Sequence, residues 1–191
     1  MPPPTLAQRV RKVLPLAVPF EGVCFRNVRP GFATPQQILS AEGSFRYGGR
    51  YNFRNTLTVL YLSCDIHTCL EETTRSLRVS GLEVAEALPR TVIGIQVRLS
   101  RVLDLTNPRI RHRLGVIKRE LVETDWEFIQ NVLGEESLTQ QLGRFARDAG
   151  LEALLVPSAA LPRTGKNLDI FPDRLLPTSS LHVVNVGLLT L

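Results

Sequence analysis

Apolar and polar positions alternate with a period of two in several short segments of the chain, which is the pattern of half-buried β-strands. The segment 23–28 (VCFRNV) shows this alternation and ends before Pro30 and Gly31, which interrupt strands. The expected strands cover residues 23–28, 56–63, 91–99, 102–105, 151–156 and 181–189. Residues 31–50, which are rich in glycine and proline, are expected to form a long irregular loop, and such loops are usually functional.

Helical periodicity is concentrated in two other parts of the chain. Asp65 can cap a helix whose apolar stripe runs from residue 66 to residue 77. The segment 107–149 holds most of the remaining helical pattern, with a capping-box signature that begins at Ser137 and with Gly150 where a C-terminal cap is expected.

Strands therefore come first and last in the sequence, and helices lie between them. This order is not a regular alternation of strand and helix, so it favours an α+β fold over a doubly wound parallel sheet. Neither a Gly-x-Gly-x-x-Gly motif nor a P-loop lysine motif is present. We expect residues 1–20 to be a lead-in with one helical turn from Thr5, and residues 21–191 to be a single domain in which 107–149 is mainly helical.

Composition excludes several functional classes. The chain has 191 residues, 23 basic and 18 acidic, and its net charge of +5 is spread along the sequence. No lysine-rich tract or interleaved aromatics accompany the charge, so direct nucleic-acid binding is disfavoured. No apolar run is long enough to span a membrane, and the N-terminal apolar segment is broken by prolines, so we expect a cytoplasmic protein.

The three cysteines argue against a secreted disulfide scaffold, because their number is odd and they form no framework. Cys64, His67 and Cys69 do not have the spacing of a zinc site, and no second half-site follows. We therefore expect no metal.

One stretch carries the candidate chemistry, although each of its residues also has a plain structural explanation. Arg50 follows a glycine pair and suits a pyrophosphate, but it could equally be a solvated surface residue. Arg26 interrupts an apolar strand, where it is either a buried functional charge or a residue of the solvent face. Tyr61 can stack on a cationic ring or simply pack. Glu71 and Glu72 could each form a surface pair with the basic residue at position 75, and helical geometry does not choose between them.

The order of these motifs along the chain resembles the RES-domain family, which is named for its arginine, glutamate and serine. The resemblance covers about residues 20–190. It is carried by Phe25-Arg26, Gly48-Gly49-Arg50-Tyr51-Asn52, Leu60-Tyr61-Leu62-Ser63, Leu70-Glu71-Glu72, Val156-Pro157-Ser158 and Asn167-Leu168-Asp169-Ile170-Phe171. Members of the family resemble ADP-ribosyltransferases in fold, which implies a split β-sheet core with a helical insert. Many are toxins of toxin–antitoxin pairs that degrade NAD.

The resemblance also implies roles for individual residues. In the family pattern the glutamate follows the strand tyrosine by eleven residues, which selects Glu72 and makes Glu72, Arg26 and Tyr61 the expected catalytic residues. Tyr51 stands where many relatives carry tryptophan. The expected substrate-binding residues are Arg50, Tyr51, Ser158 and Asn167.

The implied activity is cleavage of the nicotinamide–ribose bond of NAD, with water or phosphate as the acceptor. NAD would be the substrate and no separate cofactor is expected. An antitoxin protein that covers the active site would be the partner, and the sequence is also compatible with a homo-oligomer. Two alternatives stay open: ADP-ribose transfer to a macromolecule, and a non-catalytic basic module that binds nucleic acid or protein.

Overall fold

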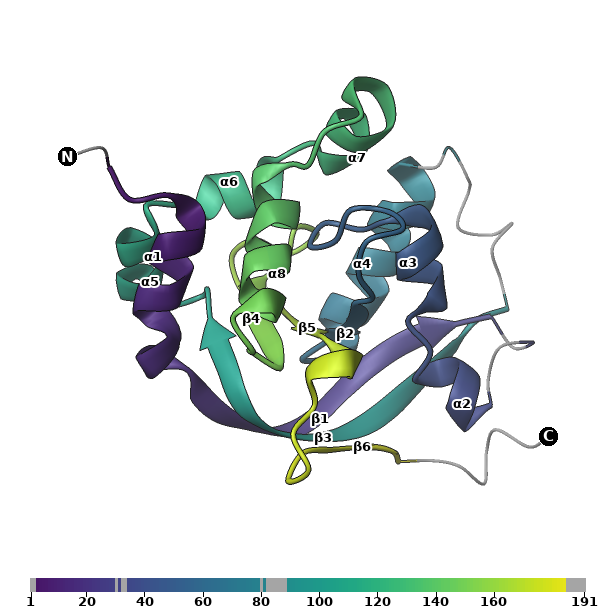
Figure 1. Cartoon of the computed structure of the whole chain (residues 1–191). Helices are drawn as coiled ribbons and strands as arrows, with labels where there is room; N and C mark the ends of the chain where they lie inside the picture. Colours follow the sequence, from purple (N-terminus) through teal and green to yellow (C-terminus); the bar gives the residue numbers. More distant parts are fainter. Residues whose placement is uncertain (1–2, 30, 32–33, 80, 82–88, 185–191) are drawn as a thin grey trace.

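The computed structural model describes residues 3–29, 31, 34–79, 81 and 89–184 and has a mixed α+β architecture, as the sequence predicts. Its sheet contains six strands in the order β1-β2-β5-β4-β3-β6 (Figure 1). The strands are β1 (Val18–Val28), β2 (Leu60–Ser63), β3 (Thr91–Asp104), β4 (Ala153–Pro157), β5 (Lys166–Ile170) and β6 (Ser180–Val183).

Helices precede, interrupt and cover this sheet. The α-helices are α1 (Leu6–Val13), α2 (Pro35–Ile38), α3 (Glu42–Tyr47), α4 (Ile66–Val79), α5 (Pro108–Leu114), α6 (Lys118–Glu123), α7 (Trp126–Phe128) and α8 (Leu138–Asp148). Short 3-10 helices are η1 (Leu14–Leu16) and η5 (Pro172–Arg174), and η4 (Ile129–Leu133) is a π-helix. Within the described residues, no helix is long and apolar enough to cross a membrane.

The long strands β1 and β3 pair antiparallel and form the curved ribbon at the base of Figure 1. One end of β1 also pairs with β2, where Phe25 lies opposite Ser63, and the far end of β3 pairs in parallel with β4. Strand β5 lies between β2 and β4 and is antiparallel to both. The short strands β2, β5 and β4 thus stand side by side above the ribbon, and their side chains face the helices that complete the site.

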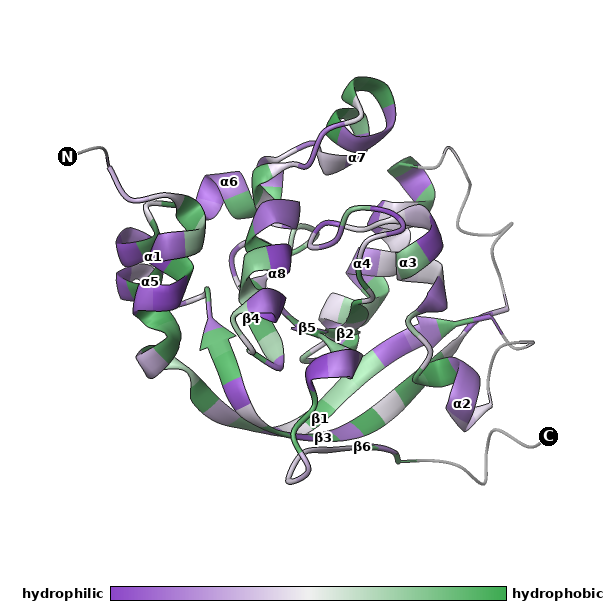
Figure 2. Cartoon of the chain, in the orientation of Figure 1, coloured by the Kyte–Doolittle hydropathy of each residue, from purple (hydrophilic) through white to green (hydrophobic). Residues whose placement is uncertain are grey.

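Two groups of buried apolar side chains pack against the sheet and form the core. One group lies under α1, α5 and α8 and includes Leu142, Leu154 and Phe171, and the other includes Cys24, Leu62 and Ile95 from the strands. Figure 2 shows the banding of apolar and polar residues along α1 and α8 that this one-sided burial requires. Alternate residues of β2 and β5 point to opposite faces, so residues 61, 167 and 169 share the face that the site uses.

The N-terminal segment is more than a lead-in with a single turn. Helix α1 spans two turns and begins with a capping box in which the Thr5 side chain accepts from the Gln8 backbone N–H. Its residues Leu6, Val10 and Val13 are buried, because they recur at helical spacing and pack against α5 and α8. The capping box and this stripe were both visible in the sequence.

Other element boundaries also differ from the expectations. The segment 31–50, expected to be irregular, contains α2 and α3. The two strands expected over 91–99 and 102–105 are one strand, β3, because the buried Glu152 carboxylate accepts from the backbone N–H groups of Ser100 and Arg101 at 2.7 and 2.8 Å. The last expected strand, 181–189, is β6 as far as residue 183, and residues 185–189 lie outside the described part. Helices α5 to α8 lie within the segment 107–149, which was expected to be mainly helical.

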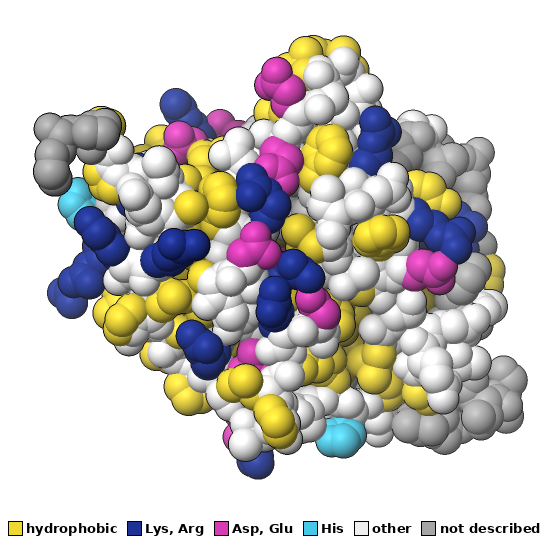
Figure 3. Space-filling view, in the orientation of Figure 1, with side chains coloured by type: hydrophobic (Ala, Val, Ile, Leu, Met, Phe, Trp, Pro, Cys, Tyr) yellow, Lys and Arg dark blue, Asp and Glu magenta, His cyan; other side chains and the backbone are white. Residues whose placement is uncertain are grey.

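The charge of the chain is unevenly distributed over its surface. In Figure 3, Lys and Arg side chains gather at the α1 and α5 side, and basic and acidic groups alternate along α8. The α8 pairs include Arg144 with Glu136 at 2.7 Å. Such pairs place opposite charges side by side near the centre of this face.

Candidate functional site

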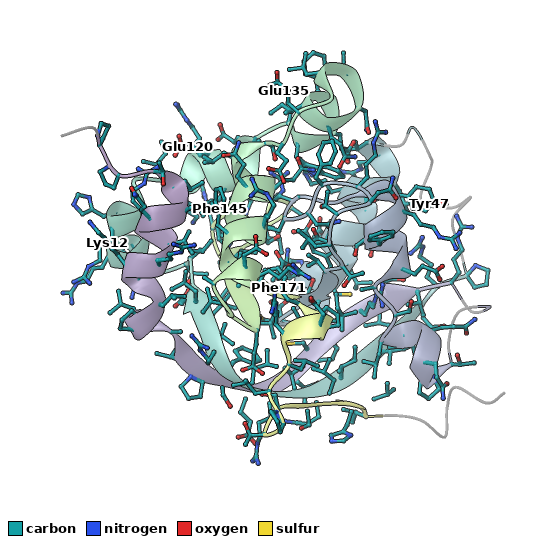
Figure 4. All side chains as sticks on the ribbon, in the orientation of Figure 1. Lys12, Tyr47, Glu120, Glu135, Phe145 and Phe171 are labelled. Atoms are coloured by element: carbon teal, nitrogen blue, oxygen red, sulfur yellow. The ribbon has the colours of Figure 1, made fainter. Side chains whose placement is uncertain are left out.

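A cavity of about 550 Å³ lies between α3, α4, α7 and the strands β2 and β5. Its volume falls in the range of small-molecule and cofactor sites. It brings together most of the residues that the sequence singled out, because its lining includes Arg26, Arg50, Tyr51, Tyr61, Glu72 and Asn167. The rim carries Tyr47, whose side chain is 75% exposed and projects outward in Figure 4, whereas Phe171 lies near the centre of the molecule.

Glu72 is the centre of the polar contacts in this cavity. Its Oε1 atom accepts from Ser158 Oγ at 2.6 Å, from Asn167 Nδ2 at 2.7 Å and from the backbone N–H groups of Ala159 and Ala160 at 3.1 and 3.4 Å. Oε2 has no hydrogen-bond partner among the described residues. One carboxylate oxygen is therefore held in place by donors, while the other is available to a ligand. Glu71, by contrast, lies 3.9 Å from His67 on the exposed side of α4.

Ser158 and Asn167 are themselves oriented by neighbours. Ser158 Oγ accepts from the backbone N–H groups of Ala160 and Leu161 at 3.1 and 2.9 Å, so its single proton is directed at Glu72. Asn167 Oδ1 accepts from Ser63 Oγ at 2.9 Å, which turns the amide nitrogen toward the same carboxylate. Both residues were expected to bind substrate, but the structure places their side chains on Glu72.

The glycine pair forms a tight loop against Tyr61. Gly48 has φ of 78°, and Gly49 approaches Tyr61 so closely that a Cβ atom would lie 2.5 Å from its hydroxyl. That hydroxyl accepts from the Tyr51 backbone N–H at 2.9 Å and donates to Asn52 Oδ1 at 2.8 Å. The Tyr61 hydroxyl is therefore fully used by the protein, and only the ring of this half-buried side chain remains for a ligand. Burial raises its pKa well above the ordinary value.

Two buried glutamines, which the sequence did not single out, hold this loop from the other side. Gln140 of α8 donates to the carbonyl of Gly49 at 3.1 Å. Gln130 of the π-helix η4 donates to the carbonyl of Tyr47 at 3.0 Å and accepts from the Arg54 backbone N–H at 3.1 Å. The only signal of their role in the sequence was that they are polar residues inside an expected helical segment. A π-helix at such a position is typical of functional sites.

The two candidate arginines are each partly engaged by backbone carbonyls. Arg26 donates to the carbonyls of Ile38 and Ser40, the second at 2.8 Å, and so ties β1 to the segment after α2. Arg50 donates through Nη1 to the carbonyls of Leu121 and Thr124 at 3.2 and 2.9 Å. Burial lowers the pKa of both guanidinium groups. Both line the cavity and give it a positive wall that is built into the fold.

Two further groups form the floor of the cavity. Tyr51 is only 1% exposed and packs in the core, which limits the direct substrate contact that was expected of it. Asp169, which the sequence did not assign a role, lies opposite Tyr61 in the β2–β5 ladder and is also 1% exposed. Its Oδ1 atom and the Tyr51 hydroxyl have no hydrogen-bond partner within the described residues. Burial, and then the charge of Glu72, raise the pKa of Asp169 well above its ordinary value.

This arrangement suits one kind of ligand. A free carboxylate oxygen can stabilise a positive centre, and an aromatic ring beside it can stack on a planar cation. The arginines favour a negatively charged group in the same molecule. No three His, Cys, Asp or Glu side chains of the described residues cluster as metal ligands.

Comparison with known proteins agrees with this geometry. Residues 24–183 match the family model of the RES domain. NAD(+) phosphorylase MbcT of Mycobacterium tuberculosis is 28% identical over 126 residues, which cover 65% of this chain and 62% of that protein. The probable NAD(+) phosphorylase Rv3189 of the same organism is 32% identical over 129 residues, covering 68% of this chain and 56% of that protein. The aligned region thus spans about three fifths of these curated relatives.

A solved structure shares the fold over nearly the whole length. The chain superimposes on a chain of the M. tuberculosis MbcT–MbcA toxin–antitoxin complex with a TM-score of 0.69 and 21% sequence identity. The alignment covers 94% of this chain and 91% of that one. The family model spans most of the chain and contains every element of the site. The chain therefore belongs to the RES domain family.

Proposed function

We propose that this protein cleaves NAD at the nicotinamide–ribose bond and uses inorganic phosphate as the acceptor. The observation that carries the proposal is the state of Glu72, with Oε1 held by four donors and Oε2 open to an aromatic, arginine-lined cavity. NAD combines a planar cation, a ribose and a diphosphate, so it matches the free carboxylate, the ring and the positive wall. The names of the two curated relatives support phosphate as the acceptor.

The chemistry needs only one carboxylate. The nicotinamide nitrogen is already cationic, and cleavage of its bond to ribose C1″ releases a neutral leaving group, so no general acid is required. The transition state resembles an oxocarbenium ion. Glu72 Oε2 would stabilise this positive charge and hold a ribose hydroxyl. Because Oε1 is already fixed, little reorganisation is needed as the charge develops.

Other residues have supporting roles in this proposal. The ring of Tyr61 stacks on nicotinamide, and Arg26 and Arg50 attract the diphosphate. Ser158 and Asn167 keep the carboxylate oriented through their hydrogen bonds to Oε1. Tyr51 supports the floor beneath Tyr61. NAD is thus the substrate, and no separate cofactor enters the reaction.

Incubation of the purified protein with NAD, with and without phosphate, tests the proposal. We expect release of nicotinamide that depends on phosphate, and a second product with the mass of ADP-ribose carrying one phosphate group on C1″. Free ADP-ribose would indicate water as the acceptor. NAD labelled in the adenylate part separates both from transfer, which leaves label on a macromolecule. Absence of nicotinamide release would refute the proposal.

A toxin–antitoxin role is a second part of the proposal. The structural relative is a toxin in complex with its antitoxin. Around the cavity, this chain exposes apolar side chains on α3 and on the α7–η4 tip, where Figure 3 shows them grouped. Tyr47, Phe128, Val132 and Leu133 are 75, 50, 67 and 54% exposed. An antitoxin covering these residues would close the cavity. Expression that arrests growth, reversed by the product of a neighbouring gene, is the expected result.

The finer description of the fold as ADP-ribosyltransferase-like also belongs to this proposal. The curved β1–β3 ribbon with β2, β5 and β4 standing above it supports a split sheet. The helices α5 to α8 between β3 and β4 occupy the position of the expected insert. A structure with NAD bound across β2 and β5 would test the relation directly.

A further inference from the structure

Arg75 lies one helical turn after Glu72 on α4, and both side chains line the cavity. The sequence suggested that Arg75 would form a surface pair with Glu71 or Glu72, which stand four and three positions before it. Among the described residues, Arg75 forms no ion pair with either. Glu71 lies near His67, and Glu72 accepts from β5 and from the segment after β4. Within the described part of the chain, Arg75 is therefore a half-buried cation without a carboxylate partner.

Arg50 is close to Arg75 across the cavity. The positive charge of Arg75 lowers the pKa of Arg50, in addition to the larger effect of burial, and the charge of Glu72 raises it. Arg50 uses only Nη1 in its contacts with the carbonyls of Leu121 and Thr124. Glu127 also lines the cavity but forms no ion pair with either arginine in the described part of the chain. Arg50 and Arg75 thus line the same cavity as Glu72.

Like charges held together in a partly buried cavity repel, and this repulsion is offset when an anion lies between them. A tetrahedral oxyanion with two negative charges can accept bidentate hydrogen bonds from two guanidinium groups at once. The position is equally informative. In the proposed reaction Glu72 marks ribose C1″, and Arg75 lies on the next turn of the same helix and lines the same cavity. In NAD the rest of the ribose separates C1″ from the diphosphate. The diphosphate therefore does not occupy the position that the acceptor takes at C1″.

We propose that Arg75, together with Arg50 in the lining of the same cavity, binds the inorganic phosphate that acts as acceptor. The inference rests on the proposed function, for which it identifies the second-substrate subsite. In the step, one phosphate oxygen forms a bond to ribose C1″ as the bond from C1″ to the nicotinamide nitrogen breaks. The electron pair of that bond returns to the ring, which leaves as neutral nicotinamide. The product is ADP-ribose 1″-phosphate, and no further reactant is needed.

Steady-state kinetics of Arg75→Gln, with phosphate and NAD varied separately, tests the subsite. Loss of charge-assisted hydrogen bonds raises KM for phosphate about 10- to 100-fold. KM for NAD stays within about threefold, since the diphosphate lies elsewhere. Arg50→Gln raises both KM values, because Arg50 faces both anions. Arg78→Gln is the matched control, as Arg78 is an exposed residue of the same helix that does not line the cavity.

Other outcomes separate this inference from the proposed function. An Arg75→Gln protein with raised KM for NAD and unchanged KM for phosphate overturns the subsite, as does NAD cleavage that is independent of phosphate. If the wild-type protein does not cleave NAD, the proposed function fails, and a direct measurement of phosphate binding tests the subsite by itself. The ³¹P resonance of inorganic phosphate should then broaden when the wild-type protein or the Arg78→Gln variant is added, but not when the Arg75→Gln variant is added. Equal broadening with all three overturns the inference. Arg75→Lys, which keeps the charge, should restore part of the binding if the Gln variant folds poorly.

Discussion

Replacing Glu72 with glutamine keeps the size of the side chain and removes its charge. The amide oxygen can take the place of Oε1 and accept from the same donors, chief among them Ser158, Asn167 and Ala159. The amide nitrogen then occupies the position of Oε2 in the cavity. The substitution therefore separates folding from catalysis: the hydrogen bonds that fix the residue remain, while the negative charge facing the substrate is lost.

The expected loss of activity can be estimated from Coulomb's law. A unit negative charge about 4 Å from the developing positive centre contributes about 4 kcal/mol at an effective dielectric constant of about 20. That free energy corresponds to a decrease in kcat of about a thousandfold. Stability should change by less than about 1 kcal/mol, because no donor at Oε1 loses its acceptor. Glu72→Ala, in contrast, leaves these donors without an acceptor, at about 1–3 kcal/mol for each one that stays buried.

Two measurements check this reasoning. Nicotinamide release at saturating NAD and phosphate gives kcat, and urea denaturation gives the free energy of unfolding for both variants. Glu71→Gln is the control, because Glu71 is the adjacent carboxylate and lies outside the cavity lining. An E72Q protein that retains more than a tenth of wild-type activity would refute the electrostatic role. An E72A protein as stable as E72Q would refute the role of these donors.

Four other substitutions give separate tests. Ser158→Ala removes the 2.6 Å hydrogen bond to Glu72 and should lower kcat about 10- to 100-fold with little change in KM for NAD, so an unchanged kcat would contradict the positioning role. Gly143→Ala places a Cβ atom 1.8 Å from the Tyr51 carbonyl oxygen and should cost about 3 kcal/mol or more of unfolding free energy. Gly43→Ala, whose Cβ meets nothing within 4 Å, should raise that free energy by about 0.5–1 kcal/mol, and equal effects of both substitutions in urea denaturation would be inconsistent with the packing. The folded-state pKa of Asp169 is raised, so above about pH 4 the unfolded wild-type protein binds fewer protons than the folded one. The wild type therefore loses stability as the pH rises. Asp169→Asn removes this titration, so its stability relative to the wild type should increase from pH 5 to pH 8. A Tm difference that does not change with pH would show that Asp169 does not titrate as expected.

The sequence by itself determined the local elements and the family. Period-two alternation located the strands other than β5 (Lys166–Ile170), because alternate residues of a half-buried strand face the core and the solvent. The apolar stripe after Asp65 located α4, and Ser137 located the start of α8. The RES-domain resemblance is confirmed by the family model. The strand and helix patterns are encoded within about 10 to 20 neighbouring residues, whereas the resemblance rests on the order of motifs along most of the chain.

The choice of Glu72 over Glu71 shows the limit of that information. Helical spacing left both glutamates possible, and only the resemblance preferred Glu72. The structure distinguishes them physically, since Glu72 accepts from Ser158 and Asn167, which are 86 and 95 residues away in sequence. No local pattern can indicate which of two adjacent carboxylates will meet donors at such a separation.

Tertiary structure decided the roles inside the cavity. The register of β2, β5 and β4 brings Asn167 beside Ser63 and places Asp169 under Tyr61. The same packing engages Arg26 with backbone carbonyls and leaves Arg75 without a carboxylate partner among the described residues. Hydropathy records whether a position is buried, but it carries no information about which polar groups meet there. Those encounters depend on strand register and helix packing, which are set by contacts between distant segments.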